Sequence, residues 1–263
     1  MYVRDGDAYV GTTLTQGGWD PGAANGGTVL ALIGHCLDEV PTLVPMTLSR
    51  FTADIHRPVT LGQRLHVVPT IIREGKKIQI VQLCVVAGDL ELVRVSALRI
   101  RDHALADGVL TSTTDARPAD ALVPPEEAMD IRELTAQMPG FLGAVDMRRT
   151  RTVDGQGTGT WVRLTAPVVA GSPVSPSARL AGLFDFANLI GMQDHPTSVT
   201  MINPDLSAHV LREPTGEWIA ITGDTRFNTG LGRGVSTATF SDADGVFAFA
   251  SISQILQMRE PPR

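Results

Sequence analysis

The chain has 263 residues, of which 43% are hydrophobic and 19% are charged, and its formal net charge is −6. Such a chain can bury a sizeable core without help from a metal or a disulfide framework. The mild acidity, with no run of Lys and Arg, disfavours nucleic acid and anionic lipid as partners. We expect a cytoplasmic protein without a membrane span, because the chain lacks both a signal-peptide segment and an apolar stretch of roughly 18 residues.

The first half begins with a predicted hairpin and a buried helix. Residues 2–6 and 7–12 read as two short strands, and apolar residues at helical spacing predict a helix over 26–40, after the turn-rich segment DPGAANGG. Four runs rich in β-branched residues follow and predict four strands. They cover 47–59, 62–72, 76–88 and 91–101.

The second half repeats this order. A predicted hairpin and a helix over 177–190 again precede four predicted strands. Pro58 and Pro214 close matching strands, and the strands after them have nearly equal lengths, so we interpret the chain as a duplicated ββαββββ unit. The predicted strands are 145–153, 159–167, 199–213, 216–227, 234–243 and 245–258.

The segment between the halves is rich in Ala, Asp, Thr and Pro and has no periodicity. Its length exceeds that of ordinary internal loops, so we interpret it as a linker. The predicted organisation is an N-terminal subdomain (1–103), a linker (104–139) and a C-terminal subdomain (140–263).

A long apolar helix followed by a curved antiparallel sheet that wraps it is the hotdog unit. We therefore predict an α+β fold, a tandem (double) hotdog. The alternative is an all-β barrel with incidental helices, but the helix recurs at the same place in each half. Hotdog sheets have exposed edges, so we expect a homodimer or larger homo-oligomer.

Several common catalytic motifs are missing. There is no GxSxG elbow and no GxxxxGK[ST] loop, and the GQGTG and GLGRG clusters read as hairpin turns. The six histidines and two cysteines lack metal-ligand spacing. We expect neither a metal nor a cofactor.

Three segments carry a resemblance to a known family: LAGLFDFANLIG, INPDLSAHVLREPTGEW and DGVFAFASISQILQMR. They resemble the corresponding pieces of the acyl-CoA thioesterase II family, whose members are double hotdogs. In that family an Asp on the second-half helix, a Thr at the start of the next strand and a Gln on the last strand hold a water molecule. The resemblance implies that Asp185 and Gln254 are catalytic, with Asn203 in the position of the Thr.

The residues themselves point to the same places. Asp185 lies in an otherwise apolar helix, where an ionised carboxylate is costly unless it is paired or functional, so we expect a raised pKa. The alternative is an exposed helix-end Asp. Gln254 shares a strand face with Ile252 and Leu256 and needs hydrogen-bond partners there, unless it is a polar residue on an edge strand.

Asn203 departs from the family pattern. Its amide can bind a water as a Thr hydroxyl can, but Pro204 removes a backbone donor and is expected to reshape the strand entry. Asp205 and Ser207 alternate with Asn203 in sequence and are expected on the same face. We therefore include Ser207 as a candidate substrate-binding residue. The alternative is that it is an ordinary polar residue of the strand.

In the first half, Gly26 and Gly27 open the predicted helix, where backbone N–H groups could approach a thioester carbonyl. The alternative is that these glycines allow close packing. The counterpart of Gln254 is expected near Ala97, with no Gln there, so only the second half is expected to be catalytic.

The predicted function is hydrolysis of acyl-CoA, or of another acyl thioester, by a water molecule oriented by Asp185, Gln254 and Asn203. A non-catalytic acyl-binding or acyl-CoA-binding protein of the same fold is the main alternative. A hotdog dehydratase or hydratase is disfavoured, because a His paired with an Asp or Glu is not evident.

Overall fold

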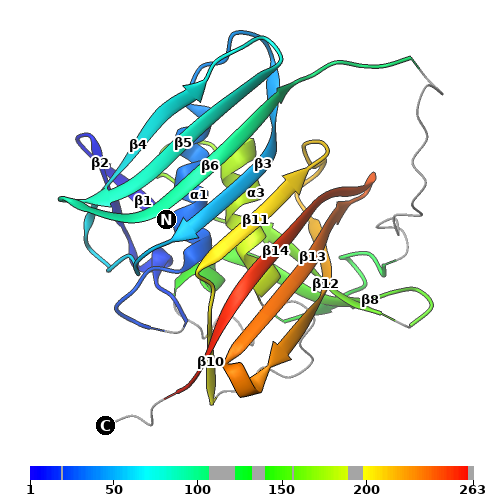
Figure 1. The fold of residues 1–263 in the computed structure, drawn as a ribbon. Helices are drawn as coiled ribbons and strands as arrows, with labels where there is room; N and C mark the ends of the chain where they lie inside the picture. Colours follow the sequence, from blue (N-terminus) through cyan, green and yellow to red (C-terminus); the bar gives the residue numbers. More distant parts are fainter. Residues whose placement is uncertain (19, 107–121, 132–139, 156, 189–197, 260–263) are drawn as a thin grey trace.

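The computed structural model describes residues 1–18, 20–106, 122–131, 140–155, 157–188 and 198–259. Its strands form a 14-stranded antiparallel sheet that curves around two helices, α1 (Gly26–Asp38) and α3 (Pro176–Phe184) (Figure 1). The strands are β1 (Tyr2–Asp5), β2 (Ala8–Gly11), β3 (Met46–Ile55), β4 (Arg64–Arg73), β5 (Ile78–Ala87), β6 (Leu90–Arg101), β7 (Met129–Asp130), β8 (Val145–Arg151), β9 (Thr158–Leu164), β10 (Val199–Ile202), β11 (Asp205–Val210), β12 (Ile219–Asn228), β13 (Arg233–Asp242) and β14 (Gly245–Met258).

The sheet contains the same arrangement twice. The first half has the order β1-β2-β4-β5-β6-β3, and the second half has the matching order β8-β9-β12-β13-β14-β11. The halves meet where β3 and β11 pair antiparallel, with Thr52 opposite Ser207 (Figure 1). Each helix follows the second strand of its half. The predicted double hotdog is therefore confirmed.

The two helices lie side by side and run antiparallel, with the N-terminus of each near the C-terminus of the other (Figure 1). The Asn25 side chain caps α1 by accepting a hydrogen bond from the Gly27 amide at 2.8 Å. Gly34 permits the close approach, because a Cβ there would collide with the carbonyl of Ser177.

One apolar core serves both halves. Helix α1 is buried from Gly27 to Leu37, and inward-facing residues of the strands of both halves cover the two helices. The Phe184 and Phe240 rings pack edge to face with centroids 5.1 Å apart. The division of the chain at 104–139 stays a prediction, but the two halves share their buried surface.

Three features differ from the sequence-based expectations. Helix α3 ends at Phe184 and continues as a 3-10 turn, η4 (Asp185–Asn188), and the predicted helix end at 189–190 lies outside the described residues. The predicted strand 199–213 is divided into β10 and β11 at Asn203 and Pro204. Within the predicted linker, β7 pairs with β8 at the sheet edge; a two-residue strand is too short to produce a periodic pattern.

Candidate active site

Asp185 is the charged residue that the second half places between the two helices. It is the first residue of η4, between the buried rings of Phe184 and Phe186. Its Oδ2 accepts a hydrogen bond from the Gly27 amide of α1 at 2.9 Å, and its Oδ1 accepts one from Asn203 Nδ2 at 2.6 Å. The carboxylate therefore joins α3, the N-terminus of α1 and the entry to β11.

The surroundings of Asp185 raise its pKa. Burial in apolar surroundings disfavours the ionised carboxylate, while the hydrogen bonds from Asn203 and Gly27 lower the pKa and offset part of the effect. Both donors are neutral amides, so the carboxylate is held by hydrogen bonds and not by an ion pair. The expected upward shift is confirmed in direction, and a carboxylate with a raised pKa is a stronger base than an exposed one.

The two glycines at the start of α1 have different neighbours. A Cβ at Gly26 would lie 3.1 Å from Asp185 Oδ1, so the absence of a side chain leaves space beside the carboxylate. A Cβ at Gly27 would lie 2.8 Å from the carbonyl oxygen of Gly182 on α3. Gly27 thus serves helix packing as well as donating its amide to Asp185, and both residues lie at the candidate site.

Asn203 reaches Asp185 because of a β-bulge. Ile202 pairs with Ile255 and Ser207 pairs with Ser251, so the four residues 203–206 lie opposite the three residues 252–254. Asn203 and Pro204 together lie opposite the single residue Gln254, so one of the two is the extra residue of the bulge. Bulges redirect side chains and often lie beside active sites. The reshaping expected from Pro204 is confirmed.

The bulge places Ser207 away from Asp185. Leu206 and Ala208 are buried in the core, so Ser207, between them, points to the opposite face of the sheet. Asp205 is on that outer face too, where its carboxylate accepts a hydrogen bond from the Ser253 amide at 2.7 Å. The expectation that Asn203 shares a face with Ser207 is wrong, because the extra residue reverses the alternation.

Gln254 lies on the inner face of β14 and is 3% exposed. Its Nε2 donates to the main-chain oxygen of Asn188 at 3.0 Å, to Asn188 Oδ1 at 2.8 Å and to Ser236 Oγ at 3.0 Å. Asn188 belongs to the same 3-10 turn as Asp185. The structure therefore joins Gln254 to Asp185 through this turn, and it joins Asn203 to Asp185 directly.

Sequence reasoning missed Asn188 and Ser236. Asn188 is 4% exposed and ends the segment LAGLFDFAN, so a polar residue three positions after Asp185 in an apolar run was the available signal. Ser236 gave no such signal, because β13 contains several Ser and Thr residues on both faces.

The counterpart of Gln254 in the first half is Arg99, not a residue near Ala97. In β3 the register shifts between Leu48 and Arg50, which pair with Arg99 and Leu98. This bulge is the equivalent of the one opposite Gln254. The expected position was wrong because matching the strands by length cannot locate a bulge.

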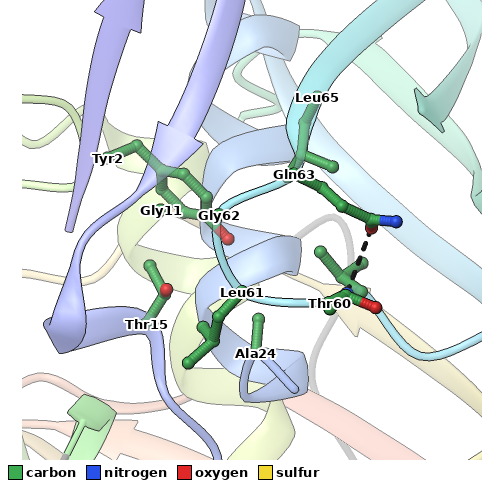
Figure 2. A pocket seen from close by; sticks show the side chains of 10 residues that line it. Tyr2, Gly11, Thr15, Ala24, Thr60, Leu61, Gly62, Gln63 and Leu65 are labelled. Carbon is green, nitrogen blue, oxygen red and sulfur yellow. Dashed lines mark hydrogen bonds between the residues drawn. The ribbon is translucent and has the colours of Figure 1, made fainter. Parts of the chain in front are cut away.

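Two cavities lie elsewhere. Figure 2 shows a narrow crevice beside the N-terminal end of α1, where Tyr2, Thr15, Ala24 and Leu61 meet. It has no room for a water molecule (about 0 Å³), compared with the roughly 300 Å³ of a small ligand pocket. A groove of about 380 Å³ lies at the other end of α1, beside Cys36 and Glu39. Asp185 lines neither.

Over the described residues, no group of three or more His, Cys, Asp or Glu side chains is arranged to hold a metal ion. In the same part of the chain, no helix is both long enough and apolar enough to cross a membrane.

The repeated sheet and the two antiparallel helices define a double-hotdog protein. A family model for the acyl-CoA thioesterase C-terminal domain matches residues 117–256, and one for the N-terminal domain matches residues 15–100. The chain belongs to the acyl-CoA thioesterase family.

Solved structures agree with this fold. A protein from Thermobifida fusca described as a thioesterase II has a TM-score of 0.70 at 17% identity, over 98% of this chain and 95% of that one. A hot dog fold protein of unknown function from Alicyclobacillus acidocaldarius has a TM-score of 0.68 at 14% identity, over 99% of this chain and 97% of that one. The acyl-CoA thioesterase II TesB2 from Mycobacterium marinum has a TM-score of 0.67 at 14% identity, over 97% and 95%. Comparison with curated proteins gives no match.

Proposed function

We propose that this protein hydrolyses acyl-CoA, or another acyl thioester, with a water molecule that Asp185 activates as general base. The observation that carries the proposal is the Asp185 carboxylate, held by the neutral donors Gly27 and Asn203 with a pKa raised by burial. Such a group can take a proton near neutral pH more readily than an ordinary Asp. Membership of the acyl-CoA thioesterase family supports the substrate class.

The proposed reaction needs no covalent intermediate. The water oxygen bonds to the thioester carbonyl carbon while Asp185 accepts a water proton. The carbon–sulfur bond of the tetrahedral intermediate then breaks, and the thiolate takes up a proton to leave as the thiol. The products are the free acid and the thiol, and the base is regenerated when Asp185 releases its proton.

The N-terminus of α1 is the proposed site for the thioester carbonyl. Helix N-termini present backbone N–H groups and a partial positive charge, which stabilise a developing oxyanion. Gly26 lies beside Asp185, so a carbonyl that approached this end of α1 would lie near the base. Asn203 and Gln254 complete the proposed water site, whereas Ser207 is not part of it.

The test is hydrolysis of acyl-CoAs from acetyl to palmitoyl by the wild type and by Asp185→Asn. We expect turnover of part of this panel by the wild type and a loss of about 10²-fold or more in the variant. Wild-type binding without turnover would support the alternative of a non-catalytic acyl-binding protein. Equal turnover by both proteins would show that Asp185 is not the base.

We also propose a homodimer or larger assembly. The outer face of β13 and β14 exposes the apolar side chains of Val235, Phe249 and Ile255, and exposed apolar patches commonly mark interfaces. Light scattering should give a mass of at least twice the 28.0 kDa of one chain. A single-chain mass at working concentration would contradict this proposal.

A further inference from the structure

The amide of Gln254 is held in one orientation by unambiguous partners. The main-chain oxygen of Asn188 can only accept, so the Gln254 atom 3.0 Å from it is the nitrogen. The Asn188 side chain is itself fixed, because its Nδ2 donates to the main-chain oxygen of Met201 at 3.1 Å and thereby turns Oδ1 toward Gln254. The placement of the amide oxygen follows from this chemistry.

The oxygen of the same amide has no partner among the described residues. Gln254 Oε1 is buried without a hydrogen bond, whereas Nε2 has three acceptors around it. A buried amide oxygen without a donor costs free energy, so its persistence calls for an explanation such as an ordered water or a ligand.

Gly234 leaves room for this oxygen on the neighbouring strand. Gly234 pairs with Gln254 across β13 and β14, and a Cβ at Gly234 would collide with Gln254 Oε1. The φ angle of Gly234 is not positive, so the backbone does not itself require glycine there. The missing side chain is explained by the amide oxygen itself, which lies where a Cβ would be.

We infer that Asn188 is a positioning residue that makes Gln254 a hydrogen-bond acceptor, so that Oε1 accepts a hydrogen bond from one O–H group of the hydrolytic water while Asp185 accepts one from the other O–H group and takes its proton in the reaction. This inference rests on the proposed function. A water that donates hydrogen bonds through both O–H groups has a lone pair free to attack the thioester carbonyl carbon. Ser236 supports the same orientation, and Gly234 leaves room for the amide oxygen against β13.

The experiment compares kcat and KM for an acyl-CoA in four proteins: wild type, Asn188→Ala, Gln254→Ala and the double variant. We expect Asn188→Ala to lower kcat about 10- to 100-fold with KM within about twofold, because the water is misplaced rather than the acyl chain. In the Gln254→Ala background the same change should lower kcat less than twofold, because Asn188 acts through Gln254. Equal losses in both backgrounds would overturn the inference and leave Asn188 a purely structural residue.

Gly234→Ala tests the oxygen without altering any hydrogen-bonding group. We expect its kcat to fall by about tenfold or more with KM unchanged, while the nearby control Gly230→Ala, whose added Cβ would meet only ordinary contacts, keeps wild-type kinetics. Wild-type kcat in Gly234→Ala would overturn the acceptor role of Gln254. If the wild type hydrolyses acyl-CoA and Asp185→Asn does not, the proposed function stands regardless of this result; no hydrolysis by the wild type would overturn both.

Discussion

In each half of the molecule a carboxylate at the end of one helix accepts a hydrogen bond from the start of the other helix. The neighbours of the two carboxylates differ in charge. In the second half, Asp185 accepts a hydrogen bond from the backbone amide of Gly27, in the first turn of α1. In the first half, Asp38 at the end of α1 accepts from the Ser177 amide at 2.9 Å and from its hydroxyl at 2.6 Å, at the start of α3. Each helix thus ends in a carboxylate that caps the other helix.

The strand residue beside each carboxylate makes the difference. Arg99, the counterpart of Gln254, lies 3.6 Å from Asp38 and donates to the main-chain oxygens of Leu37 and Val40 and to Gln79 Oε1. Gln79 occupies the position that Gly234 has in the second half. The first half fills this space with a cation and an amide, whereas the second half leaves a neutral amide with a free oxygen.

The different neighbours of Asp185 and Asp38 explain why one half can be catalytic and the other structural. Asp38 accepts hydrogen bonds from Ser177 and lies beside the buried guanidinium of Arg99, so it belongs to an ion pair that links the two helices to β6. A carboxylate with only neutral donors in apolar surroundings has a raised pKa and retains basicity. Duplication therefore preserved the fold while the two sites diverged in charge.

The largest effect is expected at the two carboxylates. Asp185→Asn should lower kcat about 10²- to 10⁴-fold, because it removes the proposed base. Because burial raises the pKa of Asp185 in the folded state, its ionisation above that pKa costs stability, so the variant should be as stable as the wild type at pH 7 or more stable. Steady-state kinetics and urea unfolding check both parts.

Asp38→Asn is the matched control for this experiment. It should keep kcat within about twofold and lower the free energy of unfolding, because Arg99 loses its carboxylate partner. If Asp38→Asn also abolished turnover without unfolding the protein, the division into one catalytic and one structural site would be wrong.

The next effect is on stability alone. Arg99→Met should lower the free energy of unfolding by about 2–4 kcal/mol, because it removes the donor to the Val40 carbonyl and to Gln79 Oε1 and takes the cation away from Asp38. The exposed Arg94, which pairs with Glu91, is the control, and Arg94→Met should have little effect on stability. Urea denaturation measures both; similar losses in the two variants would contradict the structural role of Arg99.

A smaller effect is expected in the pH dependence. The acidic limb of kcat/KM should lie above the ordinary Asp value of 3.8, because burial raises the pKa of Asp185. Asn203→Leu, which introduces the residue type of the first-half counterpart Leu48, removes a hydrogen bond that lowers this pKa, so the limb should move to higher pH. Correspondingly, the stability due to Asp185 is full below its unfolded pKa and is lost as the pH rises through the folded pKa. If the acidic limb of kcat/KM in Asn203→Leu stayed at the wild-type pH or moved to lower pH, Asp185 would be excluded as the titrating group.

Most of the fold could be predicted from the sequence, because the pattern of strands and helix occurs twice and each copy supports the interpretation of the other. Asp185 and Gln254 could be found as polar residues in apolar segments. The neighbours of these residues could not, because hydrogen bonds between Asn188 and Gln254 or between Asp38 and Ser177 depend on how the two helices and the sheet meet in space. The bulge at Asn203 moved Ser207 to the other face, and only Pro204 signalled it.

The smallest effect is expected at Asn203, which stands where the resemblance to the family implies a Thr. A Thr hydroxyl can donate to Asp185 as the Asn amide does, and its β-branched side chain suits an extended strand. The hydroxyl is shorter than the amide that now lies 2.6 Å from Asp185 Oδ1, so Asn203→Thr should leave this oxygen more accessible to water. Its kcat should equal or exceed that of the wild type by up to about threefold. Asn203→Val, which has the shape of Thr without the hydroxyl, is the control and should lose about tenfold, since a charged group then loses a neutral donor. A loss of tenfold or more in Asn203→Thr itself would show that the amide does what a hydroxyl cannot, and that the water site of this protein is built on Asn203 in its own way.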